Sequence, residues 1–466
     1  MSGPAHDFLS ELRWRGLLQQ VTHEDALAKH LASADTQRGG RRAYVGFDPT
    51  ADSLTIGNLV GIIQLARWQK CGHTPVVIMG GGTGFIGDPS GKSSERMLLS
   101  PEQIAANVRS IKRIFDNVIA FDQSRPNRGV ILDNYEWLST MSYLTALRDV
   151  GKHFSVNMMM QKESVKERLH NRDQGISYTE FSYMILQAYD FAHLFENHGV
   201  TVQMGGSDQF GNIVCGMDLI GKLGRSVLGG SGSPSPTNDR IESVDARPGG
   251  PGHPGEQAFG ITWPLVTKAD GGKFGKTESG AVWLTAERTS PYQFYQFWLN
   301  SADADVIRFL KVYTFFTRTE IDALEASLKS DPGKREAQKA LARHMTELLH
   351  GKDELAKVEE TTRALFAKAD PDGPFVLPDE VLKSAPSTSH DRKLLEGVGM
   401  SLVDLLAQTS LCKSKTEART QLAQGGISVN GHVAAVDARV TAGSLISGDV
   451  IALRRGKKTW HVTRWA

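Results

Sequence analysis

The chain has 466 residues, which is enough for two to four domains. Hydrophobic residues make up 40% and charged residues 23% of it, as in ordinary soluble globular proteins. The formal net charge of +1 excludes any argument for nucleic-acid binding from the overall charge. Residues 401–466 nevertheless hold nine Lys and Arg against four Asp and Glu, so positive charge is concentrated near the C-terminus.

The cysteines and the first residues bear on the cell compartment. Cys71, Cys215 and Cys412 lack the spacing of a metal site and cannot form a framework of several bridges, which favours a reducing compartment. No apolar run reaches membrane length, and the N-terminus carries Asp7 and Glu11 where a secretory signal is apolar. We therefore expect a cytoplasmic protein with no membrane partner and no metal site.

The first half of the chain has the pattern of an α/β fold. The predicted elements are a helix over 9–19, a strand over 43–48, a helix over 59–70, a strand over 74–79, a helix over 178–196 and a strand over 199–204. The strand–helix–strand unit at 43–79 predicts a parallel sheet, because two parallel strands need a crossover helix between them.

The second half changes character several times. Residues 228–257 hold seven Gly and five Pro, so we expect a mobile surface insert. Residues 292–366 have a helical period. Four prolines at 370–389 predict a linker. Residues 400–466 predict a small α/β module with two short helices and with turns at Asn430-Gly431 and Gly448-Asp449.

The most informative stretch is residues 44–96, where two apolar strands end in Gly and hydroxyl residues. Glycine lets a backbone approach a phosphate or ribose closely, and a helix beginning there points its free N–H groups at the anion. This pattern predicts a nucleotide crevice at the carboxyl ends of the strands of an open α/β sheet.

Two nucleotide motifs in the chain are coincidental. Gly82, Gly84 and Gly87 match the dinucleotide spacing, but Asp88 precedes a proline and is pushed out of the helical region just where the helix should open. Residues 216–222 have a Walker-like spacing without the hydroxyl residue that would bind Mg²⁺, and they read as an apolar helix.

Three further groups of residues suggest ligand contacts. Tyr183, Gln187 and Asp190 share one face of a helix and suit a zwitterionic or phenolic ligand, although a polar ladder satisfied within the protein remains an alternative. The run 205–209 follows a strand, and its carboxylate suits ribose hydroxyls. The loop 273–277 places two lysines around a glycine, as polyphosphate binding requires, although a solvated basic loop is the usual reading of such a run.

Together these motifs resemble a class I aminoacyl-tRNA synthetase, specifically the tyrosyl-tRNA synthetases of bacterial and organellar type. The resemblance covers nearly the whole chain and rests on five motifs in the right order, at residues 44–54, 87–92, 186–190, 205–209 and 273–277. It implies a Rossmann-like catalytic domain over 1–290, which includes the insert 228–257 and a mobile lysine loop 273–277. It also implies a helical domain on the anticodon side over 291–369, a linker over 370–399 and an RNA-binding module over 400–466, similar to a ribosomal small-subunit protein.

The resemblance implies roles for individual residues. For tyrosine, it implies phenol contacts by Tyr44 and Asp190, ammonium contacts by Asp88, Tyr183 and Gln187, and a carboxylate contact by Gln209. For ATP, it implies ribose contacts by Asp208 and Gly206, a place in the crevice for Asp48, and phosphate or ribose contacts by Thr55, Gly57 and Asn58. The remaining phosphate contacts are implied for Thr50, Lys92, Arg96, Lys273, Lys276 and Thr277.

The chain departs from the family pattern in two of these motifs. The family's His-x-Gly-His element is Thr55-Ile56-Gly57-Asn58 here, and Thr and Asn can donate hydrogen bonds but cannot carry positive charge. The aromatic residue after Asp208-Gln209 is Phe210 where the family usually has Trp. Both changes affect the expected kinetics more than the reaction.

The implied reaction joins tyrosine to tRNA(Tyr) in two steps through tyrosyl-adenylate, with ATP and Mg²⁺ and no tightly bound prosthetic group. The rival within the class is a tryptophanyl enzyme, which would lack the basic C-terminal module. Rivals outside it are an NAD-dependent oxidoreductase and a non-catalytic RNA-binding protein that kept the synthetase fold. The resemblance also implies a homodimer, which no residue pattern shows by itself.

Overall fold

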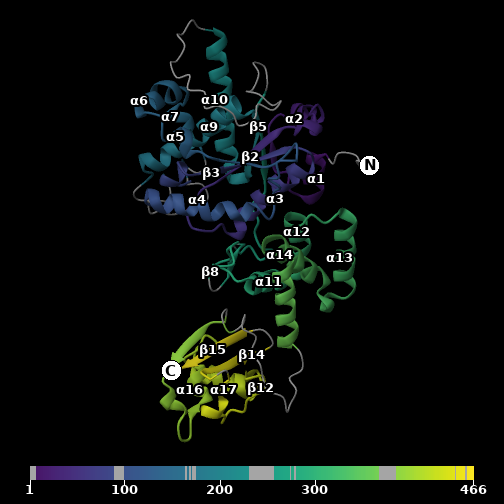
Figure 1. Cartoon of the computed structure of the whole chain (residues 1–466), viewed down its shortest axis with the longest axis vertical. Coiled ribbons are helices and arrows are strands. Elements are labelled where there is room, and N and C mark those ends of the chain that lie inside the picture. Colours follow the sequence, from purple (N-terminus) through teal and green to yellow (C-terminus); the bar gives the residue numbers. More distant parts are fainter. Residues whose placement is uncertain are drawn as a thin grey trace. The chain divides into compact units, whose positions relative to one another are not determined.

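The computed structural model describes residues 7–88, 99–162, 165, 166, 169, 175–229, 257–272, 274–277, 280–366, 382, 385–446, 448–456 and 459–466. The chain divides into two compact units. The larger is made of Met1–Thr289 and Trp298–Leu349, and the smaller of Ser290–Phe297 and His350–Ala466. Figure 1 labels the helices and strands of both units.

The larger unit is built on a sheet whose described strands have the order β1-β6-β5-β2-β3-β4. The strands from β6 to β4 are parallel to their neighbours, and β1 is antiparallel to β6. In sheet order they are β1 (Gln20–Val21), β6 (Phe259–Trp263), β5 (Val200–Gly206), β2 (Arg42–Phe47), β3 (Thr74–Met79) and β4 (Val130–Asp133). Every residue of β3 is buried, as expected of a strand covered on both faces.

Helices cover both faces of this sheet (Figure 1). They are α3 (Ile56–Lys70), α4 (Pro101–Phe115), α9 (Tyr178–His198) and α10 (Phe210–Gly229). Residues of β2 alternate between the faces: Tyr44 packs on Phe191 of α9, with ring centroids 5.5 Å apart, and Phe47 packs on Phe115 of α4 at 5.1 Å. The sheet is therefore the middle of three layers, and its parallel strands confirm the α/β fold that the sequence predicted.

Local signals set the ends of these helices. Ser100 and Gln103 form a capping box at the start of α4, with Pro101 at its first position. The side chain of Ser177 caps the start of α9, and Gly199 ends that helix at a φ of 60°. These ends fix which residues of α9 face the carboxyl edge of the sheet.

The structure agrees with the predicted strand–helix–strand unit and with the rejection of both coincidental motifs. The glycines of the dinucleotide-like motif surround a 3-10 turn, η2 (Thr83–Phe85), and the next described helix begins only at Pro101. The Walker-like residues 216–222 lie inside α10.

Shorter elements connect these layers. They are α1 (Phe8–Arg15), α2 (Glu24–Ala32), η1 (Thr36–Arg38), α5 (Tyr135–Leu138), α6 (Tyr143–Thr145), η3 (Ala146–Val150), η4 (Gly151–His153), α7 (Val156–Met160), η5 (Ser207–Gln209), β7 (Lys276–Thr277) and β8 (Gly280–Ala281). The insert predicted over 228–257 lies almost entirely outside the described residues.

The helical segment is confirmed, but it does not form the separate unit that was predicted over 291–369. Its elements are α11 (Pro291–Leu299), α12 (Asp303–Tyr313), α13 (Arg318–Ser330), η6 (Pro332–Lys334) and α14 (Glu336–Phe366). Residues 298–349 belong to the larger unit. Arg15 and Arg67 explain why, because both guanidinium groups donate to carbonyl groups at the end of α12, including that of Lys311 at 2.9 and 3.0 Å.

The smaller unit contains the predicted C-terminal module. Its elements are β9 (Ser387–His390), η7 (Arg392–Leu395), β10 (Met400–Ser401), α16 (Leu402–Leu406), α17 (Lys415–Ala423), β11 (Ile427–Val429), β12 (His432–Val433), β13 (Arg439–Val440), η8 (Ala442–Ser444), β14 (Val450–Arg455) and β15 (Thr459–Trp465). Asn430 and Gly431, with φ of 45° and 83°, make the predicted turn between β11 and β12.

The predicted linker over 370–399 is wrong in its second half. Residues 387–390 form β9, which pairs in parallel with β15 at the edge of a sheet of order β12-β11-β14-β15-β9. Leu395 of η7 is buried in the core of this module. Pairing with the last strand of the chain is a long-range contact, and the local proline content gave no sign of it.

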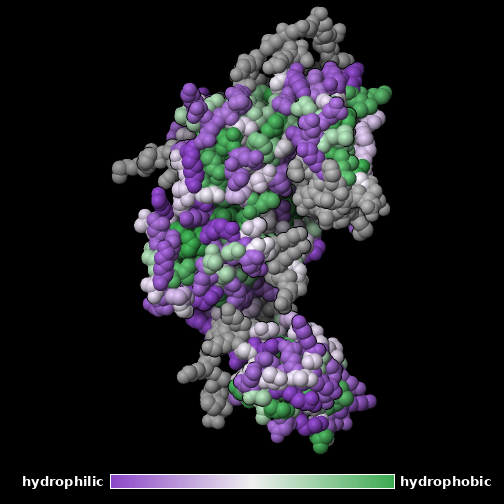
Figure 2. Space-filling view, turned by 180° about the vertical axis from the view of Figure 1, so that it is seen from behind, coloured by the Kyte–Doolittle hydropathy of each residue, from purple (hydrophilic) through white to green (hydrophobic). Residues whose placement is uncertain are grey.

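The surface of the chain mixes residue types. On the face seen in Figure 2, hydrophobic and hydrophilic side chains are interspersed. None of the helices in the described ranges is long and apolar enough to cross a membrane.

Candidate active site

A cavity of about 480 Å³ opens at the carboxyl ends of β2 and β5. These two strands are neighbours in the sheet although more than a hundred residues separate them in sequence, and this reversal of strand order is where open α/β sheets bind ligands. The cavity brings together most of the predicted site residues: Tyr44, Asp48, Thr50, Thr55, Gly57, Asn58, Asp88, Tyr183, Gln187, Asp190, Gly206, Asp208 and Gln209.

The remaining predicted residues cannot be placed as side chains. Lys92, Arg96 and Lys273 lie outside the described residues. The backbone of Lys276 and Thr277 is described as β7, which pairs with β8.

One end of the cavity is formed by Tyr44 and Asp190, both buried. The carboxylate of Asp190 accepts hydrogen bonds from Asn134 Nδ2 at 2.8 Å and from Trp137 Nε1 at 2.7 Å. The hydroxyl of Tyr44 has no hydrogen-bond partner among the described residues. A buried hydroxyl without a partner beside a carboxylate suits a ligand that carries a hydroxyl group of its own.

Burial is the largest cause of the pKa shifts of Asp190 and Tyr44 at this end of the cavity. It raises the pKa of Asp190 to about 7, although the hydrogen bonds from Asn134 and Trp137 act in the opposite direction. The pKa of Tyr44 is raised well above its ordinary value, first by burial and then by the charge of Asp190. Tyr44 is therefore a neutral hydroxyl, and Asp190 titrates near neutral pH.

Asn134 and Trp137 are functional candidates that the sequence reasoning missed. They follow β4 directly, and β4 lies beside β3 at the same edge of the sheet as the glycine-rich turn. Asn134 also accepts from the backbone N–H of Gly82 at 2.7 Å, so that it joins that turn to Asp190. Polar residues directly after a strand were the available signal.

A second group of acidic side chains lines the middle of the cavity. Asp48 accepts hydrogen bonds from Thr83 Oγ1 at 2.8 Å and from the hydroxyl of Tyr183 at 3.1 Å. Asp88 accepts from Gln209 Nε2 at 2.8 Å. The pKa of Tyr183 is raised well above its usual value by burial and then by the charges of Asp48 and Asp88.

The electrostatic character of the cavity follows from its composition. Its described lining includes four aspartates, Asp48, Asp88, Asp190 and Asp208, and none of those lining residues is Lys or Arg. Carboxylates favour a positively charged ligand group within a few ångströms. An ammonium group meets this requirement.

Amide side chains connect the acidic wall to α10. Gln187 Nε2 donates to Gln209 Oε1 at 3.2 Å, and Asn212 Nδ2 donates to Gln187 Oε1 at 2.9 Å. Some hydrogen-bonding groups on the polar face of α9 thus have partners within the protein, as expected if this face were a polar ladder satisfied internally. The residues of this face nevertheless line the cavity. Asn212 was not predicted.

The other end of the cavity combines a helix N-terminus with a turn. Thr55 caps α3, and both its backbone N–H and its hydroxyl donate to Asn58 Oδ1, at 3.1 and 2.9 Å. Free backbone N–H groups at such a terminus attract anions.

Across the cavity, burial and then the charge of Asp88 raise the pKa of Asp208. A Cβ on Gly206 would lie 2.6 Å from Asp208 Oδ1, so a larger residue there would displace that carboxylate.

No cluster of three His, Cys, Asp or Glu side chains that could hold a metal ion occurs among the residues that the structure describes.

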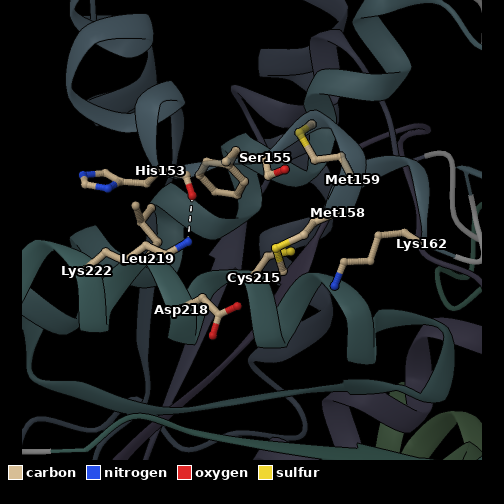
Figure 3. Close-up of a pocket in the computed structure, with 10 residues that line it drawn as sticks. His153, Ser155, Met158, Met159, Lys162, Cys215, Asp218, Leu219 and Lys222 are labelled. Atoms are coloured by element: carbon tan, nitrogen blue, oxygen red, sulfur yellow. Dashed lines mark hydrogen bonds between the residues drawn. The ribbon is translucent and has the colours of Figure 1, made fainter.

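A second pocket, between η4, α7 and α10, measures only about 20 Å³ (Figure 3). That is room for about one water molecule. Lys222 closes one side of it by donating to the carbonyl oxygen of His153 at 2.7 Å. A further pocket of about 540 Å³ lies between α1, α3 and residues 315–318, and none of the predicted site residues lines it. The cavity at the ends of β2 and β5 is the candidate active site because it brings the predicted residues together.

Comparison with known proteins agrees with this geometry. The family of class I tRNA synthetases for tryptophan and tyrosine matches residues 36–367, and the C-terminal domain of the tyrosine–tRNA ligases matches residues 379–463. A tyrosine–tRNA ligase of Roseiflexus castenholzii is 45% identical over 98% of this chain and 99% of its own length. One of Bacillus caldotenax is 45% identical over 99% of this chain and 100% of its own.

The chain belongs to the tyrosine–tRNA ligase family. Among solved structures, a C-terminally truncated mitochondrial tyrosyl-tRNA synthetase of Aspergillus nidulans superposes with a TM-score of 0.64 at 29% identity, over 78% of this chain and 94% of that one. The tyrosyl-tRNA synthetase of Coccidioides posadasii mitochondria gives 0.61 at 32% identity, over 76% and 91%. The match to the C-terminal domain begins at residue 379, ahead of β9, so it agrees with the correction of the predicted linker.

The titration of Asp190 predicts a pH-dependent contribution to stability. Its pKa rises from 3.8 to about 7 on folding, so between these values the native state holds a proton that the unfolded state has released. Stability from this group therefore falls as pH rises from 4 to 7. We expect Asp190→Asn to gain on the order of 2 kcal/mol relative to wild type between pH 5 and pH 8.

Urea unfolding of both proteins at several pH values measures this difference, and all other titrating groups cancel in the comparison. A difference that stays constant from pH 5 to pH 8 would contradict a pKa near 7 for Asp190.

Proposed function

We propose that the protein is a tyrosine–tRNA ligase that activates L-tyrosine with ATP and transfers it to the 3′ end of tRNA(Tyr). The observation that supports this most is the single cavity that joins a hydroxyl-reading end, an acidic wall and a helix N-terminus. These suit, in order, the phenol, the ammonium group and the phosphates of the two substrates.

Tyrosine would enter with its phenol towards Tyr44 and Asp190. The phenol can donate to the Asp190 carboxylate and accept from the Tyr44 hydroxyl, which would supply that hydroxyl with the partner it lacks. Phenylalanine would leave the Tyr44 hydroxyl without a partner and the Asp190 carboxylate without the phenol donor, and is therefore rejected. The ammonium group would lie against Asp88, Tyr183 and Gln187, and Gln209 would lie near the carboxylate.

ATP would occupy the other end together with Mg²⁺. Asp208 and the backbone of Gly206 suit the ribose hydroxyls. The start of α3, with Gly57 and Asn58, suits a phosphate group. Thr50, Thr55, Lys92 and Arg96, with the loop residues Lys273, Lys276 and Thr277, would supply the remaining phosphate contacts.

The chemistry needs no protein nucleophile. A carboxylate oxygen of tyrosine attacks the α-phosphorus, the bond to the bridging oxygen breaks, and pyrophosphate leaves. A hydroxyl of the terminal tRNA ribose then attacks the activated carbonyl carbon, and AMP leaves. The protein accelerates the first step by positioning both substrates and by placing positive charge where negative charge develops.

Thr55 and Asn58 change how that charge is supplied. Neither carries a proton that titrates near pH 7, so the positive charge must come from Mg²⁺ and from Lys92, Arg96 and the lysine loop. The hydrogen bonds between Thr55 and Asn58 leave the amide Nδ2 of Asn58 available as a neutral donor.

The C-terminal module is a candidate tRNA contact. It carries the excess of positive charge found in the sequence, and Lys413, Lys415 and Arg419 are exposed around the start of α17. Phosphate contacts by such side chains supply affinity that does not depend on the nucleotide sequence.

We place the reaction in the cytoplasm, a choice supported by the three free cysteines.

A homodimer is supported by an apolar patch on the larger unit. The patch consists of exposed residues of α6, η3, α7 and the start of α9: Tyr143, Leu144, Leu147, Val156, Met158, Met160 and Tyr178. The hydroxyl groups of Tyr143 and Tyr178 lie 3.5 Å apart, which ties the two ends of the patch together. Exposed apolar patches of this kind mark protein interfaces.

The homodimer can be tested by sedimentation. We expect wild type to sediment as a dimer at micromolar concentration and Leu144→Glu, which places a charge in the patch, to sediment as a folded monomer. A monomeric wild type would refute the proposal.

The activity itself is tested by ATP–pyrophosphate exchange with each of the twenty amino acids. We expect exchange with tyrosine, because only tyrosine offers both the phenol and the ammonium group that the cavity suits. Exchange with tryptophan alone would favour the rival enzyme of the same class, and no exchange with any amino acid would favour a non-catalytic RNA-binding protein.

Asp190→Ala tests how the phenol is read. We expect the ratio of kcat/KM for tyrosine to that for phenylalanine to fall strongly, because the variant lacks the carboxylate that accepts a hydrogen bond from the phenol of tyrosine and receives none from phenylalanine. Tyr44→Phe should lower the ratio less, by about tenfold, since it removes one neutral hydrogen bond. Unchanged discrimination in both variants would show that the phenol is read elsewhere.

Lys276→Ala tests the lysine loop. We expect adenylate formation to slow by roughly 2.7–4 kcal/mol in activation free energy, the scale of one lost preorganised donor. Lys329→Ala serves as the control, because Lys329 lies on α13 and pairs with Glu325 on the surface. An exchange rate equal in both variants would remove Lys276 from the transition state.

A further inference from the structure

Phe274, in the middle of the lysine loop, packs into a group of aromatic rings from the helical segment. Its ring centroid lies 4.6 Å from that of Phe309, 5.6 Å from that of Tyr313 and 5.9 Å from that of Trp298. We name these three residues the aromatic cage. All three are buried, whereas Phe274 itself is only partly buried.

The cage is a rigid unit because its members pack on one another. The rings of Trp298 and Tyr313 meet edge to face at 4.9 Å, and Phe309 lies 6.2 Å from Trp298. Aromatic pairs in these arrangements attract beyond their buried area. Phe274 thus joins the loop to helices α11 and α12.

The next residue of the loop is held from the other side, by the start of α3. Gly275 has a φ of 82°, and a Cβ there would lie 2.5 Å from Ile56 Cγ2. The N–H of Val282 donates to the carbonyl of Gly275 at 3.0 Å, and the N–H of Ile56 donates to the carbonyl of Val282 at 3.0 Å. The loop backbone is therefore tied to the helix end whose first residues line the cavity.

We infer that Phe274 is a positioning residue for tyrosine activation: its ring, held in the aromatic cage, fixes the backbone of residues 274–277, which carries the proposed catalytic residue Lys276. The inference rests on the proposed role of this lysine. Phe274 touches neither substrate, and it acts by limiting the positions that the loop can take. Misplacement of a catalytic group by 1 Å costs about 10²-fold in rate.

The test compares Phe274→Ala and Phe274→Leu with wild type in rapid-quench measurements of tyrosyl-adenylate formation. We expect the alanine variant to form adenylate about 10²-fold more slowly, with unchanged tyrosine affinity, and the leucine variant to recover much of the rate because it still fills the cage. A leucine variant as slow as the alanine variant would overturn the cage as the anchor.

Phe8→Leu is the matched control for lost packing. Phe8 is a fully buried aromatic residue of the same unit, packed edge to face on Trp68 at 4.9 Å and outside the cavity. We expect it to lower the melting temperature and leave the rate of adenylate formation intact. A loss of rate in Phe8→Leu as large as that in Phe274→Ala would mean that general destabilisation, and not loop position, lowers the rate.

A readout independent of activity is tryptic cleavage after Lys273 and Lys276. We expect Phe274→Ala to be cut faster than wild type at these bonds, and Phe274→Ala/Phe309→Ala to be cut no faster than Phe274→Ala, because both changes break one contact. Unchanged cleavage would overturn the inference. A slow Phe274→Ala beside an unimpaired Lys276→Ala would refute the proposed role of Lys276 and leave Phe274 as the anchor.

Discussion

The charge imbalance of the cavity is the constraint on which the rest of the site depends. Four aspartates line it, and none of its described lining residues is Lys or Arg. Neutral hydrogen-bond donors lower the free-energy cost of burying these carboxylates. Asn134 and Trp137 donate to Asp190, and Thr83 and Tyr183 donate to Asp48. Neutral donors stabilise a buried carboxylate but do not cancel its charge. In the proposed reaction, the ammonium group of tyrosine, Mg²⁺ bound with ATP and the lysine loop would bring positive charge to these carboxylates.

This constraint also explains how one cavity can treat two substrates differently. At the Tyr44 end, burial raises the pKa of Asp190 to about 7, so a hydroxyl is read there by hydrogen bonds rather than by charge. At the α3 end, the described lining offers a helix N-terminus and two neutral side chains, and in the proposed reaction Mg²⁺ and the lysine loop would supply the positive charge there. Charge supplied at that stage acts on the transition state more than on ground-state ATP.

The sequence predicted the local parts of the site well because each is a contiguous motif. Hydrophobic periodicity and composition predicted the strand β2, the crossover helix α3 and the polar face of α9. Residues of all three elements line the cavity. Asn134, Trp137 and Asn212 were missed because their place at the site depends on which strands and helices are neighbours. No local sequence pattern predicts that β4 ends beside the glycine-rich turn.

The errors at larger scale have the same origin. The linker ends early because β9 pairs with the last strand of the chain, and the helical segment joins the larger unit because Arg15 and Arg67 donate to the end of α12. Both contacts span long sequence separations, and neither has a compositional signature.

The most direct test of the acidic cavity is calorimetric titration with tyrosine, with tyramine, which keeps the ammonium group and lacks the carboxylate, and with 3-(4-hydroxyphenyl)propionate, which lacks the ammonium group. The account predicts that the propionate binds at least tenfold more weakly than tyramine, since hydrogen bonds to charged groups contribute about 1.5–3 kcal/mol. Equal affinity for the two analogues would contradict the claim that the aspartates select a cation.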